Sequence, residues 1–199
     1  MKKIKLELDT HIMIKSKTQR LTLSGLFLAL GIILPYVTAH GAGVPGTVLL
    51  PMHIPVLLCG FFCGSFYGAI AGALLPFLNC VLTSMPSLFP MLPIMLCELT
   101  VYGFTSGLLF TKTPLGKKRY GVFVALPISM ICGRAAYAAA FYIMFLFVGE
   151  LKALSVTAAV VTGLPGIIIQ LLLIPQIVIL TKKVIRKREN VTNKNNKSR

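Results

Sequence analysis

The chain has 199 residues, of which 56% are hydrophobic and only 13% are charged, and its mean hydropathy is +0.84. These values exclude an ordinary soluble globular domain and indicate a membrane protein. The net charge of +15 does not indicate nucleic-acid binding, which would need the basic residues to share a face with stacking aromatics. The Lys and Arg residues instead gather in residues 1–20, 112–119 and 182–199.

Uncharged stretches long enough to cross a bilayer predict six transmembrane helices. A crossing needs roughly 20 mostly apolar residues, and residues 21–38 supply the first. Residues 41–111 are long enough for three more, with breaks near Gly64 and at residues 84–87, where Pro and Ser disfavour helix. Residues 120–148 and 156–180 give the fifth and sixth spans. The predicted fold class is therefore an all-α, six-helix membrane bundle.

The basic segments predict the orientation of this bundle. Short cytoplasmic loops collect Lys and Arg, whereas exported loops do not. Six spans with a cytoplasmic N-terminus place all three basic segments, and both termini, on the cytoplasmic side. We therefore expect a basic N-terminal segment (1–20), a transmembrane domain (21–181) and a basic cytoplasmic tail (182–199). The tail is polar and of low complexity, and we expect it to be disordered near anionic lipid.

Small residues recur at helical spacing in the first three spans. Such residues let helix backbones approach closely. The spacing does not decide whether they contact a neighbouring helix of the same chain or a partner protein. The candidates are Gly60, Gly64, Gly68 and Gly72, with Gly25 and Ala29 on the first span.

Glu98 and Arg134 are the only formal charges deep inside the predicted spans. An ionised side chain there costs several kcal/mol unless it is paired or hydrated. The two form either a buried ion pair that fixes spans four and five, or a site in which the Arg134 fork binds a substrate carboxylate. Glu98 would then orient Arg134 or accept a substrate proton. Further polar side chains within spans are His53, Asn79, Tyr102, Tyr137, Tyr142 and Gln170.

Several catalytic signatures are missing from the sequence. It contains no GxxxxGK[ST] phosphate loop, no HExxH motif and no GxSxG elbow, and Asp9 is its sole aspartate. We therefore expect no enzymatic activity and no cofactor. The five cysteines lie in apolar stretches and are interpreted as packing residues, although the spacing of Cys59 and Cys63 leaves a metal or redox site open.

Three segments resemble one family of transport proteins. They are residues 49–60 (LLPMHIPVLLCG), 83–91 (TSMPSLFPM) and 98–103 (ELTVYG). They resemble substrate-binding S components of energy-coupling factor (ECF) vitamin transporters, over about residues 21–181. The resemblance implies a six-helix protein of a bacterial cell membrane. Such a protein captures a vitamin outside and docks on a transmembrane coupling subunit that carries two cytoplasmic ATPases.

The resemblance also assigns roles to individual residues. The family's Ala-xxx-Ala docking motif on the first helix corresponds here to Gly25 and Ala29, and the glycine series from Gly60 to Gly72 could ease movement against the partner. The sequence is most similar to pantothenate-type S components. The implied substrate-binding residues are His53, Asn79, Glu98, Tyr102, Arg134, Tyr137 and Gln170.

Two other functions fit the sequence without the resemblance. A stand-alone channel or proton-coupled carrier would use Glu98 as a titrating group. A structural assembly factor would use the glycines to bind a partner helix.

Overall fold

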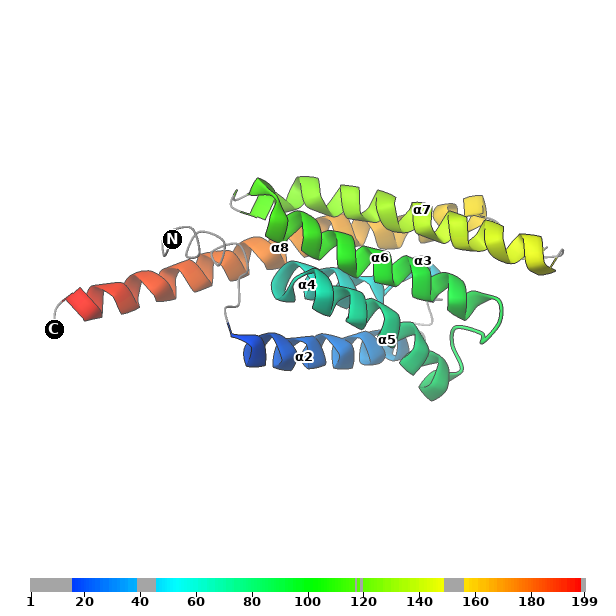
Figure 1. Ribbon diagram of the computed structural model, residues 1–199, viewed down its shortest axis with the longest axis horizontal. Coiled ribbons are helices and arrows are strands. Elements are labelled where there is room, and N and C mark those ends of the chain that lie inside the picture. Colours follow the sequence, from blue (N-terminus) through cyan, green and yellow to red (C-terminus); the bar gives the residue numbers. More distant parts are fainter. Residues whose placement is uncertain (1–15, 39–45, 117, 119, 149–155, 198–199) are drawn as a thin grey trace.

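The computed structural model describes residues 16–38, 46–116, 118, 120–148 and 156–197. Within these ranges all regular structure is helical, and Figure 1 shows the long helices side by side along one axis. The elements are α2 (Lys17–Tyr36), α3 (Gly46–Leu49), α4 (His53–Cys63), α5 (Ser65–Thr83), α6 (Met91–Lys112), the 3-10 helix η2 (Pro114–Gly116), α7 (Val122–Val148) and α8 (Val156–Lys197).

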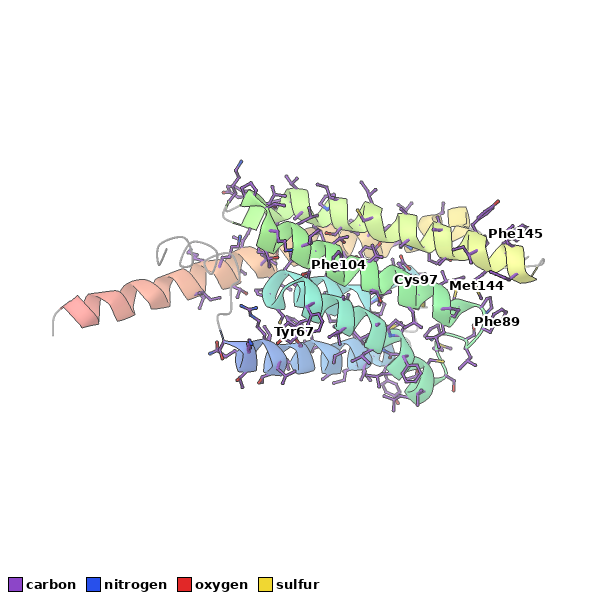
Figure 2. The ribbon with its side chains drawn as sticks, in the orientation of Figure 1. Tyr67, Phe89, Cys97, Phe104, Met144 and Phe145 are labelled. Carbon is purple, nitrogen blue, oxygen red and sulfur yellow. The ribbon has the colours of Figure 1, made fainter. Side chains whose placement is uncertain are left out.

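Five of these helices are long and apolar enough to cross a membrane, namely α2, α5, α6, α7 and α8. Their outward faces are apolar, as expected for helices that contact lipid. Phe104 on α6 and Phe145 on α7 are exposed examples, and Figure 2 shows where both lie. These five helices confirm the predicted all-α membrane architecture.

The second predicted span differs from the expectation. Its helix, α4, has 11 residues and is about 16 Å long at 1.5 Å per residue, shorter than the ~30 Å hydrocarbon core. Ten of its residues are buried, so α4 is surrounded by protein rather than lipid. An apolar run of this kind reads the same in sequence whether it faces lipid or a protein core. The count of six crossings therefore stays a prediction.

The two predicted breaks both occur. Gly64 separates α4 from α5 and has φ +98°, a conformation that L side chains rarely adopt. The second break follows Thr83, where Ser84 takes the left-handed conformation and α6 begins only at Met91.

α6 is the central helix of the bundle. It packs against α4, α5 and α7, while α2 packs on α4 and α5, and α8 packs on α3, α4 and α7. The glycines of α4 and α5 make the contacts with α6 close, because a Cβ on Gly68 would collide with the carbonyl of Gly103 and one on Gly72 with that of Leu99. Gly60 likewise lies against Ser106 and Gly103.

These contacts correct one prediction. The sequence offers Gly60, Gly64, Gly68 and Gly72 as a possible partner-docking surface, but all four are buried. Three of them face α6 of the same chain, and Gly64 forms the turn. These glycines are buried within the chain because α6 carries small residues of its own, Gly103 and Gly107, at the positions where α4 and α5 contact it.

The described parts of the basic segments lie at one end of the bundle. Figure 1 shows the start of α2, the connection from α6 to α7, and the extension of α8 at that end. Lys182 links two of them directly, because its Nζ donates to the carbonyl of Gly116 at 2.8 Å and to that of Lys118 at 3.3 Å. This grouping agrees with the arrangement from which the cytoplasmic side was predicted.

The structure has residues 182–197 of the expected tail in a helix. α8 continues as helix to Lys197 and extends beyond the bundle (Figure 1). Residues 181–197 contain neither Gly nor Pro and are rich in Lys and Arg, which are good helix formers. A helix already nucleated in the membrane can therefore propagate through them at low cost.

Candidate functional site

Glu98 and Arg134 meet inside the bundle. Nη1 of Arg134 on α7 lies 2.9 Å from Oε1 of Glu98 on α6, and the side chains are 16% and 2% exposed. The contact is mainly electrostatic, since Oε1 accepts no hydrogen bond of good geometry within the described chain. The sequence left open whether these two residues touch, and in the structure they do, joining α6 to α7.

His53 extends this pair to a third helix. Its Nε2 lies 3.6 Å from the same Glu98 oxygen, beyond hydrogen-bond reach. His53 is the first residue of α4 and is fully buried, so the short helix α4 begins inside the bundle. Helix N-termini carry a partial positive charge. The start of α4 therefore adds positive potential beside Glu98, where an anionic ligand would also be favoured.

Tyr102 lies beside the ion pair, between His53 of α4 and Gly133 of α7. It lies one turn after Glu98 on α6, and its ring meets that of His53 edge-on at 5.2 Å between centroids. On its other side is Gly133, where a Cβ would lie 2.7 Å from the Tyr102 ring. The glycine before Arg134 thus allows α7 to approach α6 at the level of the charges.

Tyr137 lies one turn after Arg134 on α7. The Arg134 guanidinium carbon is 6.0 Å from the centre of the Tyr137 ring, within range of a weak cation–π contact. Tyr137 is buried, yet its hydroxyl has no hydrogen-bond partner in the described chain.

Gln170 of α8 lies beside the same group of polar side chains. Its Nε2 donates to the carbonyl of Leu50 at 3.4 Å, and the backbone N–H of His53 donates to the same carbonyl at 3.1 Å. Leu50 has φ +49°, which is uncommon for a leucine. The segment that connects α3 to α4 is therefore attached to α8 beside the charged pair.

Sequence reasoning missed Leu50, Gly133 and Gly163, which surround these side chains. On α8, Gly163, Gly166 and Gln170 are all buried and share one inward face. A Cβ on Gly166 would collide with the carbonyls of Leu49 and Val48, so α3 lies directly on α8. Glycines four and seven residues before a buried glutamine were the available signal.

Two of the polar residues picked from sequence lie apart from this cluster. Asn79 is buried between α5 and α2 and donates to the carbonyls of Gly31 and Leu75. Tyr142 is 62% exposed on α7. The structure therefore brings together His53, Glu98, Tyr102, Arg134, Tyr137 and Gln170.

The cluster contains buried polar atoms without partners in the described chain. On Arg134 these are Nε and Nη2, which form one edge of the guanidinium and can bind a carboxylate through two parallel hydrogen bonds. Leaving each such group unpaired costs about 1–3 kcal/mol. The remaining atoms are Glu98 Oε1, His53 Nδ1 and Nε2, Tyr137 OH and Gln170 Oε1. This arrangement can accept a small polar molecule with an anionic group.

A family model supplies the comparison that decides what kind of protein this is. The model described as "ECF transporter, substrate-specific component" matches residues 19–178. The chain belongs to this family. No curated protein and no solved structure matches it.

Membership of the ECF S-component family agrees with the multi-pass membrane architecture. Its members are transporter subunits rather than enzymes, and the matched region includes every residue of the cluster. Among the described residues, no three His, Cys, Asp or Glu side chains are grouped so that they could hold a metal ion.

One outward surface of this S component is formed by small residues. Gly25 and Ala29 are exposed on α2, and a Cβ on Gly25 would meet nothing within 4 Å. Their neighbours Leu26 and Leu30 are also exposed. Unlike the glycines of α4 and α5, this pair is not covered by any described part of the chain.

Proposed function

We propose that the protein captures a carboxylate-bearing vitamin, with pantothenate favoured, and delivers it through an ECF coupling subunit driven by two ATPases. The observation that supports this most is the unpartnered Nε–Nη2 edge of Arg134, buried beside Glu98. The ion pair with Glu98 uses Nη1 alone. Without a ligand it leaves the other two donors unsatisfied, at a cost that a bound carboxylate would remove.

The groups around Arg134 suit the rest of such a ligand. Pantothenate carries hydroxyl and amide groups beside its carboxylate. Tyr137 OH and Gln170 Oε1 are both free to pair with such groups. The Tyr102 and Tyr137 rings add apolar surface for the carbon skeleton. Asn79 is not part of this proposed site, because its amide is bound to α2.

The proposed direction of uptake follows from the charge distribution. We place the basic end of the bundle in the cytoplasm of a bacterial cell, with both termini there and six crossings of the plasma membrane. The second crossing would consist of α4 and the irregular chain before it. Irregular backbone at membrane depth is tolerated where protein covers it, and residues 48–50 pack on α8.

We place the contact with the coupling subunit on α2. Gly25 and Ala29 leave an exposed strip in which a partner helix can approach the backbone closely. Such approach is favourable in a membrane, where helices associate through packing rather than through burial of apolar surface from water.

The test begins with the purified protein in detergent. Calorimetric titration should show tight binding of pantothenate. Arg134→Ala should weaken it at least about 100-fold, because a buried charge-assisted pair of hydrogen bonds is worth roughly 3 kcal/mol or more. Ala139→Leu, on the exposed face of the same helix, is the matched control and should bind normally. If a panel of carboxylate vitamins fails to bind the wild-type protein, the proposed ligand class is wrong.

Transport assays separate this function from the alternatives. In proteoliposomes, uptake should require the coupling subunit, the ATPases and ATP. Uptake by the protein alone that follows a proton gradient would instead identify a carrier. Absence of any small-molecule binding, together with a stable partner complex, would favour an assembly factor.

A further inference from the structure

Gly163 of α8 lies directly against the guanidinium of Arg134. A Cβ on Gly163 would be 3.2 Å from Nη2 of Arg134 and 3.0 Å from Cδ1 of Leu50. Both distances are shorter than ordinary van der Waals contact, so any side chain here must displace Arg134 or Leu50. Nη2 is one of the two donors on the unpartnered edge.

The guanidinium has little room to withdraw from such a side chain. Its Nη1 is held 2.9 Å from Glu98, and the Tyr137 ring lies beside it. The backbone of Leu50 is held as well, since its carbonyl accepts from both Gln170 and His53, so only the end of the Leu50 side chain can move away from Gly163. A methyl group on Gly163 would therefore change the direction of the Nε–Nη2 edge.

We propose that Gly163 is a positioning residue of the binding site. Its missing side chain lets Arg134 present two parallel donors to a ligand carboxylate between α7 and α8. This inference rests on the proposed function and adds a residue that need not contact the ligand. Gly163 acts through Arg134, so its effect should be confined to ligands with a carboxylate.

The experiment compares wild-type protein with Gly163→Ala using two probes. Pantothenate carries the carboxylate, and pantothenol carries a hydroxymethyl group in its place. Gly163→Ala should lower pantothenate affinity about tenfold, corresponding to misdirection of one charge-assisted hydrogen bond. Pantothenol affinity should change less than about twofold. Ala139→Leu, on the exposed face of α7, is the control and should change neither.

A double-mutant cycle provides a second readout. Lysine has no Nη2, so in an Arg134→Lys background the alanine at position 163 should cost less than about twofold further affinity. A residue that only supports the fold would give additive losses. This cycle also decides the question if pantothenol binds too weakly to measure.

The outcomes distinguish this inference from the function on which it rests. Equal loss of both probes, unchanged pantothenate binding by Gly163→Ala, or additive losses in the cycle would each overturn the role of Gly163 and leave the proposed function standing. Failure of the wild-type protein to bind any carboxylate probe would overturn both.

Discussion

Asn79 of α5 donates a hydrogen bond from Nδ2 to the backbone carbonyl of Gly31 on α2, at 3.2 Å. In a regular helix that carbonyl would accept from the N–H four residues later, but residue 35 is proline, which has no N–H. Asn79 therefore supplies the donor that Pro35 lacks. A polar residue that resembled a ligand contact in sequence is a helix-to-helix bond in the structure.

Asn79→Ala should lower stability without weakening ligand binding. The change leaves the Gly31 carbonyl without this donor in an apolar setting, which costs about 1–3 kcal/mol. Thermal melting in detergent and calorimetric titration measure the two effects. Thr83→Ala, which removes only local bonds to the carbonyls of Asn79 and Met85, is the control and should have a smaller effect. Loss of affinity with unchanged melting would show that Asn79 belongs to the binding site.

Glu98→Gln should have opposite effects on folding and on ligand binding. It keeps the size of the side chain but removes the counter-charge of Arg134, so the apo protein should lose roughly 3 kcal/mol or more of stability. A ligand carboxylate would then restore charge balance without competition from Glu98. Its affinity should rise, and added pantothenate should raise Tm more than in the wild type. A fall in affinity would mean that Glu98 itself contacts the ligand.

Gly68→Ala should destabilise the bundle, because the new methyl would collide with the backbone carbonyl of Gly103. Backbone cannot move aside as a flexible side chain can, so we expect a loss of about 2 kcal/mol or more. Thermal melting compared with Gly25→Ala checks this. If Gly68→Ala melts normally but no longer assembles with the coupling subunit, the glycines face a partner after all.

Lys182→Met should weaken the attachment of α8 to the connection between α6 and α7. It removes the donor that serves the carbonyls of Gly116 and Lys118 and a contact at 4.2 Å over the Phe110 ring. We expect a stability loss of about 1–3 kcal/mol, measured by thermal melting. Lys183→Met, at the exposed neighbouring lysine, should melt within about 0.5 kcal/mol of wild type; equal effects would show that only net charge matters.

Gly25→Leu combined with Ala29→Leu should prevent assembly while leaving vitamin binding intact. Both residues point outward, so the larger side chains meet no part of the described chain but would hold a partner helix away. Co-purification with the coupling subunit and titration of the isolated protein measure the two properties. Ala139→Leu on α7 is the matched control. Normal assembly of the double variant would move the docking surface elsewhere.

The sequence by itself determined the membrane architecture and the common depth of the two buried charges. Hydropathy and charge can be read from short stretches of sequence, without knowing which helices touch. They were enough to predict the four long spans after the first break, the breaks at Gly64 and Ser84, and the grouping of the basic segments. Glu98 and Arg134 could be placed at similar depth because their distances from the ends of the apolar runs were countable, but whether they touch was left open.

Only the tertiary structure decided which helices adjoin. In the structure the second span is the short, buried α4. The glycines of α4 and α5 pack against α6, and Asn79 bonds to Gly31. The structure also joins Gln170 to Leu50 across 120 positions and sets Gly163 against Arg134. An apolar run or a glycine reads the same whether it faces lipid, a partner or its own chain, because its contacts depend on three-dimensional packing and not on its sequence neighbours.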